Sequence, residues 1–177
     1  MKLNGHIFLI GFMGCGKSTN AAKLAEKTGV RQMEMDEEIV KDQRMTVSKI
    51  FEVYGESCFR DLETKLLIKL QDEPPMVVSC GGGLVLREEN VRLMKKMGTI
   101  VLLTASPQTI YERVKNSTKR PILNGNMNLA YITELMEKRR SYYEQAADTV
   151  ISTDDKTAEA ICGEILEKGI WKQQGDV

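Results

Sequence analysis

The chain has 177 residues, of which 42% are hydrophobic and 28% charged. This is enough apolar material for one folded domain and too much for a disordered segment. Its 25 basic and 25 acidic residues balance to a formal net charge of zero, so a nucleic-acid-binding protein is not expected. No apolar run reaches the roughly 20 residues that cross a bilayer, and the apolar stretch after Met1 and Lys2 is too short for a signal peptide. We therefore expect one cytoplasmic domain, residues 1–177, with neither a membrane nor a nucleic acid as partner.

Cysteine and histidine usage argues against a metal cage or a disulfide framework. Cys15, Cys58, Cys80 and Cys162 lie far apart, no C-x-x-C pair occurs, and His6 is the only histidine. A structural zinc site needs closely spaced cysteine and histidine ligands, and a disulfide scaffold needs more cysteines in a chain of this length. We expect reduced thiols and a structural role for the histidine.

Short apolar runs alternate with stretches of helical spacing along the whole chain. The apolar runs predict strands at residues 6–11, 32–36, 76–80, 100–104 and 149–152. Several of them are continuous, which is typical of strands buried on both faces of a parallel sheet. Helical spacing predicts helices at residues 17–27, 47–54, 56–71, 87–96, 107–115, 128–144 and 157–168. The fold class is therefore α/β, a three-layer sandwich around a five-stranded parallel sheet.

Glycines mark the expected helix ends, and two segments depart from the alternation of strands and helices. Expected helix ends coincide with Gly29, Gly55, Gly98 and Gly169, as C-terminal caps do. Residues 37–71 insert two helices between the second and third strands. Residues 116–127 have the polar composition of an exposed loop, which is typical of a lid. We expect a helical insert and a lid within the single domain.

Residues 11–18 read G-F-M-G-C-G-K-S, a full match to the phosphate-binding pattern G-x-x-x-x-G-K-[ST] between a strand and a helix. Glycines let successive backbone N–H groups face phosphate oxygens, and the helix N-terminus adds partial positive charge. Lys17 would reach the β- and γ-phosphates, and the Ser18 hydroxyl would ligate Mg²⁺. The motif predicts nucleotide binding; the alternative is a glycine turn that merely precedes an amphipathic helix.

Other motifs and the positions of acidic residues indicate which class of nucleotide-binding protein this is. The guanine-reading tetrapeptide N-K-x-D is missing from the chain, and neither the third nor the fourth strand ends in an acid, as a Walker-B strand would. The second predicted strand does, at Asp36, with Glu34 two residues earlier on the same strand face. A carboxylate ahead of inserted helices suits a kinase that holds a small hydroxylated acceptor near the γ-phosphate.

Three further clusters follow in chain order. Arg60 and Glu63 share one helix face, where the alternative is an ordinary solvated ion pair. Three glycines, Gly81 to Gly83, follow the third strand at the carboxyl edge of the sheet, where open α/β folds bind ligands. Arg139 and Tyr143 share a face of the long helix after the predicted lid.

In this order, the motifs resemble the shikimate kinase family of the nucleoside-monophosphate-kinase-like superfamily, from residue 6 to about residue 165. The matching stretches are G-F-M-G-C-G-K-S-T, M-D-E-E-I, I-F-x-x-x-G-E-x-x-F-R-x-x-E, the triple glycine, R-P-I-L and R-x-x-x-Y-x-x-x-A. The resemblance implies a P-loop kinase core with a substrate-binding insert. It also implies a reaction, the phosphorylation of the 3-hydroxyl of shikimate by ATP with Mg²⁺, on the way to chorismate and the aromatic amino acids. The expected partners are the small molecules ATP and shikimate, and the expected state is a monomer.

The resemblance also implies roles for individual residues. Asp36 would accept the proton of the 3-hydroxyl, and Arg120, in the lid, would close over the phosphoryl group, so that the catalytic set is Lys17, Asp36 and Arg120. The ATP-binding set is Gly14, Cys15, Gly16, Lys17, Ser18, Thr19, Arg113 and Arg120, with Ser18 as the metal ligand. The shikimate-binding set is Asp36, Arg60, Gly81, Gly82, Gly83 and Arg139, in which the two arginines would grip the carboxylate.

Some alternatives stay open. Glu34 stands where the family usually has aspartate, so it is either a metal-positioning residue or a polar strand end. Cys15, beside a helix N-terminus and Lys17, is either a reactive thiol that ATP protects or a small residue that fits the loop. Arg140 neighbours Arg139, but helix geometry turns it about 100° away. Rival functions are another small-metabolite kinase, such as a gluconate kinase, and a non-catalytic nucleotide-binding regulator.

Overall fold

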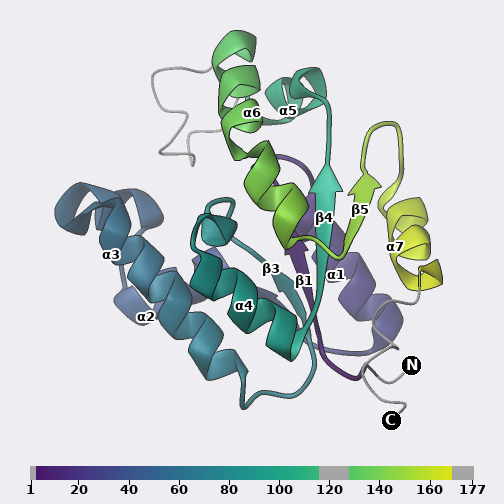
Figure 1. Ribbon diagram of the computed structural model, residues 1–177, viewed down its shortest axis with the longest axis horizontal. Coiled ribbons are helices and arrows are strands. Elements are labelled where there is room, and N and C mark those ends of the chain that lie inside the picture. The colour runs from purple at the N-terminus through teal and green to yellow at the C-terminus, as the bar shows by residue number, and fades with distance from the viewer. Residues whose placement is uncertain (1–2, 116–127, 169–177) are drawn as a thin grey trace.

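The computed structural model describes residues 3–115 and 128–168. Its strands form one parallel sheet in the order β2-β3-β1-β4-β5 (Figure 1). The strands are β1 (His6–Ile10), β2 (Gln32–Glu34), β3 (Val77–Ser79), β4 (Gly98–Thr104) and β5 (Thr149–Ser152). The expected five-stranded parallel sheet is confirmed.

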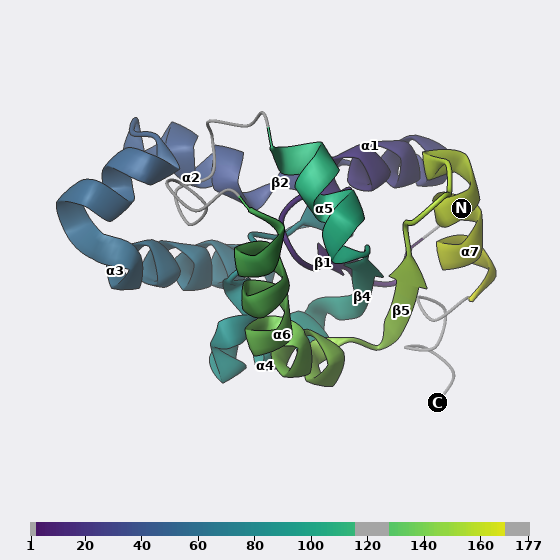
Figure 2. The same cartoon turned by 90° about the horizontal axis from the view of Figure 1, so that it is seen from above.

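Helices cover both faces of this sheet. They are α1 (Lys17–Thr28), α2 (Met35–Gln43), α3 (Val47–Leu70), the 3₁₀ helix η1 (Leu84–Leu86), α4 (Glu88–Met97), α5 (Pro107–Val114), α6 (Leu129–Ala146) and α7 (Ala158–Glu167). Figure 2 shows α1 and α7 on one side of the sheet and α4 and α6 on the other, which confirms the three layers. Within the described ranges, none of these helices is both long and apolar enough to cross a membrane.

The central strands supply the core. All five residues of β1 are buried, and so are all three of β3. Burying a large aliphatic or aromatic side chain contributes about 1.5–3 kcal/mol relative to leaving it in water. The edge strands β2 and β5 are only partly covered. The continuous apolar runs thus mark the strands with helices on both faces, as expected.

The second strand is shorter than its sequence pattern predicts. β2 ends at Glu34, and Met35 begins a helix, α2, that the sequence analysis missed. Met35 and Ile39 are buried one turn apart, and Asp36 lies in the first turn, where a carboxylate complements the helix dipole. The prediction that Glu34 and Asp36 share a strand face is wrong. The alternation of polar and apolar residues from Gln32 to Asp36 fits the end of a strand and the start of a helix equally well.

The insert contains α2 and α3. Helix α3 joins the two predicted helices, 47–54 and 56–71, across a break at Gly55, whose φ of 81° and ψ of 166° are not helical. Gly29 ends α1 with a φ of 73°, as a glycine cap does, and Gly98 ends α4 in an extended conformation. Gly169 and the predicted lid, residues 116–127, lie outside the described residues.

His6 has the structural role that the sequence suggested. The backbone N–H of Met76 donates to its Nδ1 at 3.2 Å, and its Nε2 lies 3.0 Å from the carbonyl oxygen of Leu70. Since Nδ1 accepts, the proton of the neutral ring is on Nε2, which donates to Leu70. The side chain thereby ties β1 to the end of α3 and the start of β3.

Candidate active site

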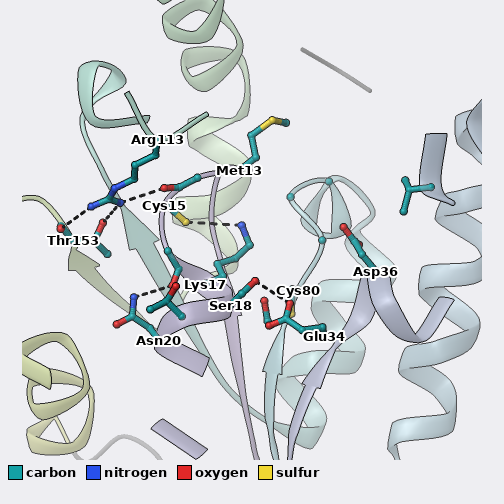
Figure 3. A pocket seen from close by; sticks show the side chains of 18 of the residues that line it. Met13, Cys15, Lys17, Ser18, Asn20, Glu34, Asp36, Cys80, Arg113 and Thr153 are labelled. Atoms are coloured by element: carbon teal, nitrogen blue, oxygen red, sulfur yellow. Dashed lines mark hydrogen bonds between the residues drawn. The ribbon is translucent and has the colours of Figure 1, made fainter. Parts of the chain in front are cut away.

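A cavity of about 530 Å³ opens at the carboxyl ends of the central strands (Figure 3). β1 lies between β3 and β4, so the connections leave it toward opposite halves of the sheet, which is where open α/β folds bind ligands. The structure places every described residue of the predicted site on this cavity: Gly14, Cys15, Gly16, Lys17, Ser18, Thr19, Asp36, Arg60, Gly81, Gly82, Gly83, Arg113 and Arg139. Arg120 lies outside the described residues.

The phosphate loop joins β1 to α1 at one side of the cavity. Gly14 and Gly16 have φ values of 81° and 94°, a region that side chains rarely adopt. Lys17 Nζ donates to the carbonyl oxygens of Gly11 at 2.8 Å and Phe12 at 3.0 Å. The ammonium group therefore lies across the loop whose backbone would surround a phosphate.

Cys15 packs inside this loop. Its side chain is 0% exposed, and its Sγ lies 3.9 Å from Lys17 Nζ. A reactive thiol has to be reached by its reagent. The burial favours the interpretation that Cys15 is a small residue that fits the loop.

Glu34 contacts the serine of the phosphate loop. Ser18 Oγ donates to Glu34 Oε2 at 3.0 Å (Figure 3). The side chain of Gln32 donates to Glu34 Oε1 at 2.8 Å. Both carboxylate oxygens are therefore engaged, one of them by the predicted metal ligand. Glu34 thus contacts the predicted metal ligand, and its carboxylate is the hard oxygen type of ligand that Mg²⁺ prefers.

Asp36 and Glu63 approach the glycine loop, which we define as Gly81–Gly83. A Cβ on Gly81 would collide with Glu63 Oε1 and lie 2.9 Å from Asp36 Oδ1. A side chain at this position would therefore displace two carboxylates of the protein itself. Figure 3 shows Asp36 beside this loop, on α2.

Arg60 is clamped between two acids on α3. Its Nη1 donates to Glu63 Oε2 at 2.7 Å, and its Nε and Nη2 donate to Glu56 Oε1 at 3.2 and 2.6 Å. The guanidinium is buried and would collide with a Cβ on Gly83. The alternative of an ordinary solvated pair is thus wrong for Arg60 and Glu63. Sequence reasoning missed Glu56, although its i, i+4 spacing to the arginine was a usable signal.

Glu63 is the most deeply buried acid of the cavity. Its side chain is 0% exposed, and burial raises its pKa to about 7, while Arg60 opposes the rise and Asp36 adds to it. Oε2 holds the arginine, whereas Oε1 has no hydrogen-bond partner within the described ranges. The carboxyl group can thus carry a proton near neutral pH.

Helix α6 contributes a second buried guanidinium. Arg139 is 8% exposed, and its buried Nη1 has no hydrogen-bond partner among residues 3–115 and 128–168. A buried donor without a partner is costly, so the group is suited to an anionic ligand. One turn later, the Tyr143 hydroxyl donates to the carbonyl oxygen of Gly82.

Arg113 ties the other end of the cavity together. Its Nη1 lies 3.2 Å from both the Gly14 carbonyl oxygen and Thr153 Oγ1, and its Nη2 donates to the Thr153 carbonyl at 3.4 Å (Figure 3). The sequence analysis missed several lining residues of the β5–α7 segment, which carries no motif: Thr153, Lys156, Ala158 and Ile161.

The fold and the cavity define a class of protein. A phosphate loop on the β1–α1 turn binds nucleotides. An aspartate and two buried arginines share its cavity, and this donor set suits a small anionic acceptor. The molecule is a P-loop kinase of the α/β class.

Comparisons with known proteins identify the family. A family model described as "SKI: Shikimate kinase" matches residues 13–169. A curated shikimate kinase of Persephonella marina is 44% identical over 161 residues, which cover 91% of this chain and 96% of the relative. One of Caldicellulosiruptor bescii is 38% identical over 168 residues, or 95% and 97% of the two chains. The chain therefore belongs to the shikimate kinase family.

Solved structures agree with this assignment. A structure titled shikimate kinase from Acinetobacter baumannii in complex with shikimate has a TM-score of 0.89 at 29% identity, covering 97% of this chain and 96% of that one. The shikimate kinase of Aquifex aeolicus has a TM-score of 0.80 at 35% identity, covering 97% and 99%. A gluconokinase of Sinorhizobium meliloti has a TM-score of 0.61 at 19% identity and covers 99% and 100%, which shows a shared fold alone.

Proposed function

We propose that this chain, a kinase that phosphorylates shikimate with ATP, carries out the transfer inside the cavity, between the phosphate loop and the glycine loop. The observation that carries this assignment is the pair of buried guanidinium groups, Arg60 on α3 and Arg139 on α6. Arg139 retains a buried donor without a partner in the described parts of the chain. A carboxylate that bridges two arginines would satisfy it through charge-assisted hydrogen bonds.

ATP would occupy the end formed by the phosphate loop and the β5–α7 segment. The backbone of residues 14–19 would surround the phosphates, and Lys17 would exchange its contacts with Gly11 and Phe12 for phosphate oxygens. Arg113 would lie beside the adenine, since it already bridges Gly14 and Thr153 at this end. Arg120 is proposed to close from the lid, outside the described residues.

Shikimate would occupy the end formed by the glycine loop and the insert. Arg60 and Arg139 would hold its carboxylate, and Asp36 would accept the proton of the 3-hydroxyl. The oxygen of that hydroxyl then bonds to the γ-phosphorus, while the bond from this phosphorus to the β–γ bridging oxygen breaks and ADP leaves. The transition state is loose and anionic, so the protein mainly positions the reactants and neutralises charge.

The residues around Ser18 fit a divalent cation, for which we propose Mg²⁺. The Ser18 hydroxyl would bind it, and Glu34, which already accepts from that hydroxyl, would orient the ligand. When bound with ATP, Mg²⁺ neutralises charge on the β- and γ-phosphates. Although the family usually has aspartate at this position, the Glu34 carboxylate also reaches the Ser18 hydroxyl directly. Glutamate can therefore still orient the proposed metal ligand.

We further propose a monomeric cytoplasmic protein, with a lid and a substrate-binding insert in one domain. In the parts that the structure describes, a single chain supplies both ends of the cavity. The cysteines are free, which agrees with a reducing compartment. The balanced charge offers no electrostatic footprint for nucleic acid.

A coupled assay of ADP release tests this function against its rivals. MgATP is supplied with shikimate, with gluconate or without an acceptor. Shikimate-dependent turnover that disappears in Lys17→Ala and Asp36→Asn is the expected result. Gluconate-dependent turnover would indicate another small-metabolite kinase, and ATP binding without turnover would indicate a regulator.

A further inference from the structure

In the glycine loop, the backbone carbonyl groups and the backbone N–H groups differ in their hydrogen bonding. The Leu84 N–H donates to the carbonyl oxygen of Gly81, and the Leu86 N–H donates to that of Gly83, both at 3.1 Å. The carbonyl oxygen of Gly82 accepts from the Tyr143 hydroxyl instead. Every carbonyl of the loop is therefore occupied, and the middle one depends on a side chain from α6.

The N–H groups of the same loop are left for a ligand. Within the described ranges, none of the three glycine N–H groups donates a hydrogen bond to the protein. The loop lines the cavity together with Arg60 and Arg139. Successive backbone donors beside two guanidinium groups form an anion-binding concavity.

Tyr143 is placed to decide where one of these donors points. In a trans peptide the C=O and N–H groups face opposite sides, and the described residues contain no cis peptide bond. Holding the Gly82 carbonyl toward α6 therefore holds the Gly83 N–H away from it. Neither glycine has a side chain to restrict rotation of this peptide, so the hydroxyl is its main external restraint.

We infer that Tyr143 is a positioning residue for the acceptor carboxylate, an inference that rests on the proposed function. Tyr143 and Arg139 lie one turn apart on α6 and are both buried. The helix thus supplies one guanidinium donor itself and orients a backbone donor through the tyrosine. The hydroxyl contacts the glycine loop and interacts with Arg139 and, by this proposal, touches no reacting atom, so its effect belongs to acceptor binding.

The variant Tyr143→Phe tests the inference, because it keeps the buried ring and removes the hydroxyl. We expect KM for shikimate to rise about five- to tenfold, which is the loss of one hydrogen-bonded donor, while kcat and KM for ATP change less than about twofold. The matched control is Tyr142→Phe, because Tyr142 is the neighbouring tyrosine and is 48% exposed. It should match the wild type in all three constants.

A second acceptor separates positioning from general damage. With the methyl ester of shikimate, which lacks the carboxylate charge, the wild type should already bind weakly and Tyr143→Phe should add about twofold or less. Equal KM values for shikimate in Tyr143→Phe and wild type would overturn the inference. An equal loss on both acceptors would also overturn it and leave a merely structural tyrosine.

The same assay distinguishes the failure of the inference from that of the proposed function. Wild type and Tyr142→Phe without shikimate-dependent ADP release would overturn the proposed function and the inference with it. Shikimate-dependent release in both, with no KM change in Tyr143→Phe, would overturn the inference alone. Thermal unfolding of the three proteins checks that they are equally folded.

Discussion

The two ends of the cavity are built in contrasting ways. The phosphate loop comes from one contiguous segment, residues 11–18, and offers backbone groups and one lysine. The proposed acceptor end combines α2, α3, the glycine loop and α6, and its charged groups Arg60, Glu63 and Arg139 are buried. A local motif can bind phosphate wherever a strand leads into a helix. A buried charge, in contrast, is stable only when the oppositely charged or hydrogen-bonding groups around it are in place. Substitutions should therefore affect the two ends differently.

The largest expected effect is on turnover, through Lys17→Ala and Asp36→Asn. We expect each variant to lower kcat by about 10²–10⁴-fold, because Lys17→Ala removes the charge proposed to stabilise the phosphoryl group and Asp36→Asn removes the proposed proton acceptor. Steady-state assays measure the loss. Lys17→Ala should still bind shikimate like the wild type in calorimetry; a parallel loss of shikimate affinity would contradict the separation of the two ends.

Arg139→Ala should act on the acceptor end alone. We expect KM for shikimate to rise by about 10²-fold, since a charge-assisted bidentate contact is worth about 1.5–3 kcal/mol or more. ATP affinity, measured by titration without acceptor, should stay unchanged. Arg140→Ala is the matched control, because the Arg140 side chain is 61% exposed and its ion pair in the described parts of the chain is with Glu137 on the same helix. Equal losses in both variants would refute the assignment of Arg139.

Glu63 should make the stability of the acceptor end depend on pH. Burial raises its pKa from 4.5 to about 7 in the folded protein. Between these values the folded chain keeps a proton that the unfolded chain has lost, so the free energy of unfolding falls as pH rises. The expected fall is about 3 kcal/mol.

Glu63→Gln, which cannot titrate, is the comparison that isolates this effect. Urea unfolding at pH 4.5, 6 and 8 should show the wild type losing stability relative to the variant as pH rises. A difference that stays constant would contradict the prediction by showing that burial and Arg60 cancel in the pKa of Glu63, and one of opposite sign would show that Arg60 dominates.

The smallest effect is expected inside the phosphate loop, at Cys15. Because its side chain is buried, maleimide should label it slowly, at a rate that MgATP changes less than about twofold. Cys58 is half-buried, so it is replaced in a Cys58→Ser variant, and peptide mapping by mass spectrometry then distinguishes Cys15 from the buried Cys80 and Cys162. Rapid labelling that MgATP suppresses would restore the alternative of a reactive Cys15.

The sequence by itself determined the frame of the molecule and its nucleotide end. Continuous apolar runs predict β1 and β4 because both faces of a central parallel strand are buried. The phosphate loop is readable since its function needs only glycines, a lysine and a hydroxyl at fixed spacing. The family motifs also placed Asp36, Arg60 and Arg139 on one cavity.

Only the tertiary structure decided how the acceptor residues are held. The pattern around Met35 fits a strand and a helix start, and the packing of α2 against α3 selects the helix that carries Asp36. The spacing of Arg60 and Glu63 shows a shared face but not that the face is buried. Tyr143 meets Gly82 across 61 residues of chain. Periodicity reports which side of an element is apolar, whereas contacts between distant elements depend on how their side chains pack. At this end of the cavity, those contacts determine which charged groups are paired and which hydrogen-bond donors remain available for a ligand.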